Sequence, residues 1–84
     1  MRVPPGLDSD CFIAILTDPE AGFEIAAKIG GWYVLEKPGH DAAIVLRPGT
    51  RYGYQETSDW IGWSGIGWEL FDKLKAKYCP SEIF

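Results

Sequence analysis

Apolar residues fall in short runs that glycine, proline and acidic residues separate. The first is the continuous run 11–16, Cys-Phe-Ile-Ala-Ile-Leu, and a buried strand is its predicted structure, although periodicity alone leaves a helix over 8–16 open. The segment before it holds two prolines and a glycine and predicts an irregular arm over 1–7. A helix at 8–16 would leave a sheet of three strands and a helix-flanked meander.

A helix is predicted next, over 18–29. The sequence Thr17-Asp-Pro-Glu20 has the form of a capping box, in which the threonine side chain accepts a backbone N–H and the glutamate reaches back. Gly30 and Gly31 predict the helix end, where a positive φ is commonly needed. Between them, small or apolar residues recur at spacings of three and four, as on one face of a helix: Gly22, Ile25, Ala26 and Ile29.

Three β-rich runs follow and predict an antiparallel meander over 32–55. Residues 32–36 and 42–46 are rich in β-branched or aromatic side chains, and the second run is apolar throughout, which predicts burial on both faces. Tyr52 and Tyr54 lie two apart, so in a strand they would share one face. The last strand is therefore predicted to show an aromatic face.

Two Pro-Gly dipeptides separate these runs. They stand at the centres of Lys37-Pro-Gly-His40 and Arg47-Pro-Gly-Thr50. Proline fixes one φ and glycine supplies a positive one, which is the pattern of a type II turn. Both segments are predicted to reverse the chain between neighbouring strands of the meander.

Glycine and tryptophan dominate the segment after the meander. Its three glycines lie so close together that an irregular loop is predicted over 57–67. A helix is predicted over 67–78, because apolar residues mark one stripe and acids precede lysines along it, which complements the helix dipole. Pro80 predicts the end of this helix.

These elements predict one compact α+β domain over 1–84. Its sheet would have three or four mostly antiparallel strands, with the meander at 32–55 as the largest part, and two helices would pack on one face. The composition agrees with a folded chain, since 46% of the residues are hydrophobic and 24% are charged.

The net charge limits the partners. Twelve acidic residues against eight basic ones give a net charge of -4, which argues against nonspecific binding of nucleic acid, since that affinity rests on Lys and Arg. The acids are concentrated in 1–26 and 56–72, where Arg2 is the lone basic residue. This charge suits a protein partner with a basic surface, for example a nucleic-acid-binding complex.

Cys11 and Cys79 are the two cysteines of the chain. The N-terminal residues lack the apolar core of a signal peptide, and no apolar run approaches the roughly 18–20 residues that cross a bilayer. A cytoplasmic location is predicted, the host cytoplasm if the chain is phage-encoded, and there the two thiols would be reduced. A disulfide that ties the first element to the end of the last helix is the alternative.

The tryptophans are the main functional signal. Trp60 and Trp63 lie among glycines, which supply no side chains to cover them, so at least one is predicted to be exposed and to anchor a partner. Two other interpretations are bulk for a small core and a platform that stacks on sugars or bases. Acidic and aromatic neighbours complete the predicted partner-binding set: Tyr52, Tyr54, Glu56, Asp59, Glu69 and Asp72.

No motif predicts catalysis, a metal or a cofactor. His40 is the single histidine and stands beside Asp41, but no serine or cysteine shows an activating context, so a solvent-exposed turn histidine is predicted. The glycines at 62, 65 and 67 lack the Lys-Ser/Thr of a phosphate-binding loop. Two cysteines and one histidine at unrelated spacing do not make a zinc site.

The predicted function is a noncatalytic protein-binding module, an acidic, aromatic-rich inhibitor or adaptor such as a phage-encoded inhibitor of a bacterial CRISPR-type defence complex. Neither direct nucleic-acid binding nor membrane contact is expected, and the oligomeric state stays open. The alternative is a small nucleic-acid-associated transcriptional regulator. It would use Arg47, Arg51, Tyr52 and Tyr54 on one sheet face, as RNA-binding sheets use same-side aromatics.

Overall fold

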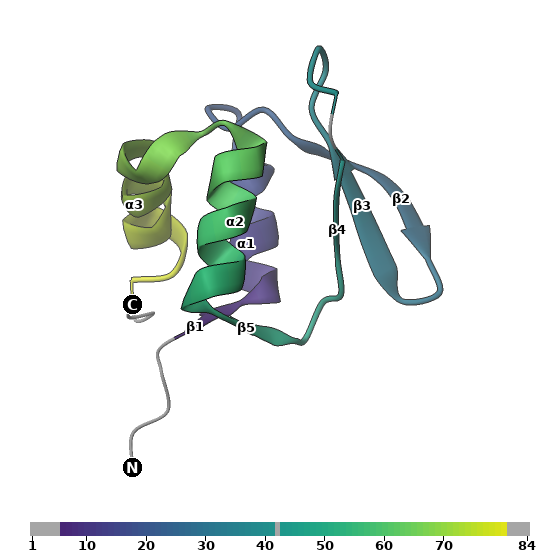
Figure 1. Ribbon diagram of the computed structural model, residues 1–84, viewed down its shortest axis with the longest axis horizontal. Helices are drawn as coiled ribbons and strands as arrows, with labels where there is room; N and C mark the ends of the chain where they lie inside the picture. Colours follow the sequence, from purple (N-terminus) through teal and green to yellow (C-terminus); the bar gives the residue numbers. More distant parts are fainter. Residues whose placement is uncertain (1–5, 42, 81–84) are drawn as a thin grey trace.

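The structure, a computed structural model, describes residues 6–41 and 43–80. Over these residues the chain forms three helices and two antiparallel sheets, so the predicted α+β class is confirmed, with one helix more than expected. Figure 1 shows the helices gathered on one side and the larger sheet extending on the other. The elements in chain order are β1 (Gly6–Asp8), α1 (Ser9–Leu16), β2 (Glu24–Ile29), β3 (Trp32–Glu36), β4 (Ile44–Leu46), β5 (Arg51–Gly53), α2 (Tyr54–Ser64) and α3 (Gly67–Tyr78).

The first apolar run forms α1, so the predicted strand over 11–16 is wrong and the helical alternative holds. Asp8 starts the helix as its N-cap, because its side chain accepts a hydrogen bond from the backbone N–H of Asp10 at 3.0 Å. The run is apolar on nearly all sides because α1 packs against β1, α2 and α3, and such burial hides the helical period. The arm predicted over 1–7 lies outside the described residues except at its end, which forms β1.

A turn and a strand replace the helix predicted over 18–29, and that prediction is wrong. Thr17 does not begin a helix, because its hydroxyl donates to the carbonyl of Ile13 at 2.7 Å and so belongs to the C-terminal end of α1. Gly22 has a φ of 85°, which a continuing helix does not allow. The spacing of three and four in this segment is coincidental.

The larger sheet has the strand order β2–β3–β4, with antiparallel neighbours throughout. Gly30 and Gly31 have positive φ, as predicted, but they form the two-residue turn of the β2–β3 hairpin rather than a helix end. The meander therefore covers 24–46 instead of 32–55.

The segment predicted as the last strand of the meander belongs to another sheet. β5 pairs with β1, and Tyr52 lies opposite Leu7. The second Pro-Gly turn thus leads from one sheet to the other, although Gly49 has the predicted positive φ, at 79°. The first turn is as predicted, because the backbone N–H of His40 donates to the carbonyl of Lys37 at 2.9 Å.

A helix, α2, occupies most of the segment predicted as a loop over 57–67, so that prediction is wrong. Gly62 lies inside this helix, where it costs about 1 kcal/mol relative to alanine, and burial of the opposite helix face outweighs that cost. Gly65 and Gly67 have positive φ and turn the chain between α2 and α3. The helix predicted over 67–78 is confirmed as α3.

The core lies where the helices meet the inner face of the larger sheet. The sheet contributes Leu35, Ile44 and Leu46, all buried. From the helices, Phe12 and Phe71 are fully buried, with ring centroids 6.2 Å apart. Aromatic packing between α1 and α3 is therefore central to the fold.

Cys11 and Cys79 form a disulfide, so the expectation of two reduced thiols is wrong. The bond joins α1 to the residue that follows α3, across a sequence separation of 68. The two Cα atoms are 6.1 Å apart, within the ordinary range for a disulfide. The pairing depends on how α1 packs against α3, which an argument from compartment does not address.

Candidate protein-binding surface

Trp63 is 61% exposed, so the predicted exposure of at least one of the two clustered tryptophans is confirmed. It lies in the last turn of α2, whose opposite face is buried. Glu56 and Asp59 are also exposed and lie on the same side of the helix, because residues three, four and seven apart share a helix face. We call Glu56, Asp59 and Trp63 the α2 surface.

The backbone of Trp63 is held by the loop between β3 and β4. Nε2 of His40 lies 2.7 Å from the Trp63 carbonyl oxygen, and because a carbonyl only accepts, Nε2 carries the donated proton. The His40 ring also lies edge-on to Phe23, with centroids 5.9 Å apart. The histidine is therefore half-buried and positions the end of α2, rather than being the solvent-exposed turn residue predicted.

The other aromatic residues of the predicted set are in contact with neighbours. Trp60 is half-buried and stacks on Phe12, with centroids 5.0 Å apart, while Tyr52 meets its ring edge-on at 4.3 Å. Tyr54 is exposed and stacks on Trp68 at 5.7 Å. Tyr52 lies in β5 and Tyr54 begins α2, so the shared sheet face expected for them is not formed.

Glu69 and Asp72, the two remaining predicted residues, are exposed on the solvent side of α3. Lys73 follows them and donates to a Glu20 carboxylate oxygen at 2.9 Å. The surface of α3 is thus mixed in charge. The α2 surface carries acidic side chains alone beside Trp63, since no basic residue occurs over 52–72.

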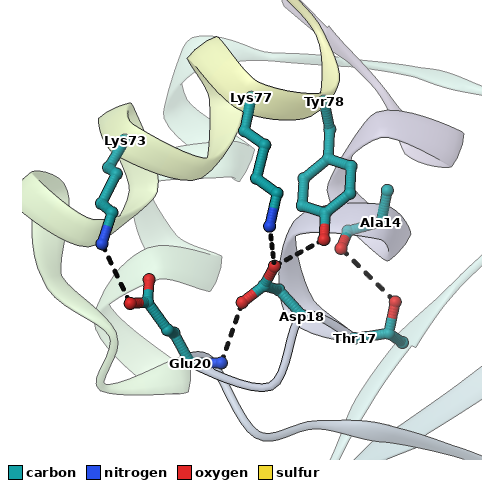
Figure 2. A network of polar contacts seen from close by, with 7 residues as sticks. All are labelled: Ala14, Thr17, Asp18, Glu20, Lys73, Lys77 and Tyr78. Atoms are coloured by element: carbon teal, nitrogen blue, oxygen red, sulfur yellow. Dashed lines mark hydrogen bonds and ion pairs between the residues drawn. The ribbon is translucent and has the colours of Figure 1, made fainter.

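Asp18 is a buried acid at the turn between α1 and β2, and the capping-box interpretation missed it. Figure 2 shows its carboxylate facing Tyr78 and Lys77 of α3. It accepts hydrogen bonds from the Tyr78 hydroxyl at 2.5 Å, the Lys77 Nζ at 3.3 Å and the Glu20 backbone N–H at 2.8 Å. These contacts, the one from Tyr78 foremost, lower the pKa of Asp18 below its ordinary 3.8 despite its burial.

Asp18→Asn is expected to make the stability of the fold less sensitive to acid. Because the folded-state pKa of Asp18 is lowered from 3.8, its ionised form stabilises the fold above that pH, and the contribution is lost as the pH falls through the folded pKa. Urea unfolding between about pH 7 and about pH 2 measures this, and the wild type should approach the variant at acid pH. Tyr78→Phe, which removes the main donor, should weaken the acid dependence similarly. A difference in unfolding free energy between the wild type and Asp18→Asn that stays constant with pH would contradict the prediction.

The larger sheet also exposes apolar side chains on the face turned away from the helices. Ile29 is 65% exposed, Val45 50% and Trp32 44%. Cross-strand pairing joins them to two half-buried residues on the same face, because directly opposed residues share a face. We call this group the outer sheet face, and its members are Ala27, Ile29, Trp32, Val34 and Val45.

The predicted burial of 42–46 on both faces is wrong at Ala43 and Val45, which are exposed, and Ala42 lies outside the described residues. Ile44 and Leu46 are buried, so the strand does alternate in burial. A run in which every side chain is apolar carries no alternation in its sequence, and the exposed face was therefore missed.

A hollow of about 460 Å³ lies at one end of the outer sheet face. Its residues are Glu24, Glu36, Lys37, Pro38, Gly39, His40, Asp41 and Ala43.

Across residues 6–41 and 43–80, no group of three or more His, Cys, Asp or Glu residues is placed to hold a metal ion. Within the same residues, no helix is long and apolar enough to span a membrane.

Comparison with known proteins identifies no relative of this chain. No protein-family model, curated protein or solved structure shows detectable similarity to the chain.

Proposed function

We propose that the protein is a noncatalytic binding module that uses the α2 surface to hold a protein partner with a basic surface. The exposure of Trp63 carries this proposal. Tryptophan is among the residues that contribute most to binding energy when a partner covers them. The hydrogen bond from His40 to the Trp63 carbonyl fixes the backbone of this residue before binding, which lowers the entropy lost on association.

Charge supports a basic partner. Glu56 and Asp59 share a helix face with Trp63 and precede it, and the chain has a net charge of -4. Acidic groups at the rim of an interface mainly speed the encounter with an oppositely charged surface. An inhibitor or adaptor role fits this chemistry, for example a phage-encoded inhibitor that occupies the basic groove of a CRISPR-type complex.

The alternative of a nucleic-acid-associated regulator receives less support. It depended on Tyr52 and Tyr54 sharing a sheet face, and they lie on different elements.

The cytoplasmic location belongs to the proposal as well. The Cys11–Cys79 bond weighs against that location, because the cytoplasm keeps most thiols reduced.

Trp63→Ala is expected to weaken partner binding by about 2 kcal/mol or more, roughly thirtyfold, without unfolding the protein. Wild type and variant serve as parallel baits in a lysate, and proteins retained by the wild type alone are identified by mass spectrometry and titrated by calorimetry.

Replacing both Glu56 and Asp59 by lysine should mainly slow association with the same partner and weaken its dependence on salt.

Trp32→Ala is the matched control, because it removes an exposed tryptophan from the outer sheet face and should leave partner binding unchanged. Circular dichroism and thermal unfolding check that each variant is folded. Equal binding by Trp63→Ala and the wild type would refute the proposal. Tight binding of nucleic acid at physiological salt, with no protein partner present, would favour the regulator instead.

A further inference from the structure

The outer sheet face is apolar where a solvated sheet face is usually polar. An antiparallel sheet with one face in water commonly alternates apolar and polar side chains along each strand. Here the inner face is buried, yet five outward side chains of the three strands are also apolar: Ala27, Ile29, Trp32, Val34 and Val45. An exposed apolar face of this kind is a candidate surface for contact with another protein.

The edge of the sheet is a poorer docking site than its face. β2 and β4 are the two edge strands, and an unpaired edge can pair with a strand from another chain. The register shift at Ala26 and the charged side chain of Lys28 disfavour such pairing at β2, and β4 is only 3 residues long. The contact expected of this sheet is therefore made through side chains of its outer face.

Opposite charges lie at the two ends of this face. Glu24 and Glu36 are directly opposed at one end, where Asp41 and Lys37 line the same hollow, so acidic residues outnumber basic ones at this end. At the other end, Tyr33 pairs with Leu46, and the alternation of burial continues to Arg47, which is exposed. This alternation places Arg47 on the outer side, next to Trp32.

We propose that the outer sheet face packs against the same face of a second copy of this chain. A two-fold axis that lies in the plane between the sheets and is inclined to the strands, perpendicular to the line from Arg47 on the β4 side to Glu24 on β2, exchanges these two corners of the face between the copies. Arg47 of each copy then meets Glu24 and Glu36 of the other, and the apolar centres face each other. An axis parallel to the strands would place the glutamates of both copies together, which like charge disfavours.

The size of the face sets the strength of this dimer. By ordinary strand spacing it spans about 14 by 17 Å, less than the roughly 800 Å² that a standard interface buries on each partner. The dimer is therefore weak, as interfaces below the standard size are. It uses a surface other than the α2 surface, so its existence does not depend on the proposed partner.

Sedimentation analysis of the full chain from about 10 μM to about 1 mM tests the dimer, because a weak dimer is populated only at high protein concentration. A monomer–dimer equilibrium is expected for the wild type and for Trp63→Ala. Val45→Asp, which places a carboxylate in the apolar centre, should weaken dimerisation at least tenfold while leaving the circular dichroism spectrum unchanged. A wild type that stays monomeric throughout would overturn the proposal.

Charge exchange tests the orientation. Arg47→Glu should weaken dimerisation at least fivefold, and adding Glu24→Arg and Glu36→Arg to it should restore the lost affinity. Each variant is compared with the wild type in thermal unfolding, so that a loss of dimer is not confused with a loss of fold. Failure of the exchanged variant to recover, with its fold intact, would overturn the two-fold arrangement.

Discussion

Replacing both Cys11 and Cys79 by serine is expected to lower the free energy of unfolding by about 4 kcal/mol, because the bond closes a loop across a sequence separation of 68 and restricts the unfolded chain. Domains of this size are stable by only about 5–15 kcal/mol. The loss is therefore expected to bring the chain close to its unfolding threshold at room temperature.

Chemical unfolding with and without a thiol reductant measures this effect. The reductant should destabilise the wild type to the level of the serine variant and should leave that variant unchanged, which separates the disulfide from other consequences of the substitutions. If the reduced wild type were as stable as the oxidised protein, the disulfide would have no role in holding the fold together.

Phe12→Ala is expected to cost about 3–5 kcal/mol, as for a large aromatic side chain removed from a core. Phe12 is 0% exposed, and its ring lies 5.0 Å from Trp60 and 6.2 Å from Phe71, centroid to centroid. Alanine would leave a cavity between α1, α2 and α3. Urea unfolding gives the change in free energy, and near-ultraviolet circular dichroism should lose part of its tryptophan signal.

Val45→Ala is the matched comparison for Phe12→Ala. Val45 is 50% exposed, so its truncation creates no cavity and should change stability by less than about 0.5 kcal/mol. A loss of less than about 1 kcal/mol for Phe12→Ala would mean that the helices pack differently from the arrangement described, since a fully buried ring in a rigid core costs more to remove.

The sequence predicted those elements whose signals are local. The strand beginning at Trp32, the first Pro-Gly turn and the last helix follow from side-chain periodicity and backbone chemistry within a few residues. The prediction of a helix over 18–29 was wrong because the spacing of apolar residues in this segment also fits a helix. The segment becomes a strand only when the Gly30-Gly31 turn pairs it with β3. Pairing of β5 with β1 joins residues far apart in the chain, which no local pattern encodes.

The candidate surface was predictable in part. Trp63 could be singled out because glycines surround it, but the same glycines concealed the helix that presents it. Asp18 accepts a hydrogen bond from Tyr78, which is 60 positions away in the sequence, and no local pattern predicts this contact. The outer sheet face was not predicted, because exposed apolar residues look the same in a sequence as buried ones.

The disulfide also makes most of the polypeptide into a covalent ring. A protease that cuts any one peptide bond between Cys11 and Cys79 opens the ring but leaves the two pieces attached to each other. The helices, joined through α1 and the end of α3, would keep their high effective concentration after such a cut. The exposed Gly30-Gly31 and Pro-Gly turns are therefore sites where the chain can be nicked, or a foreign segment inserted, without the two halves parting.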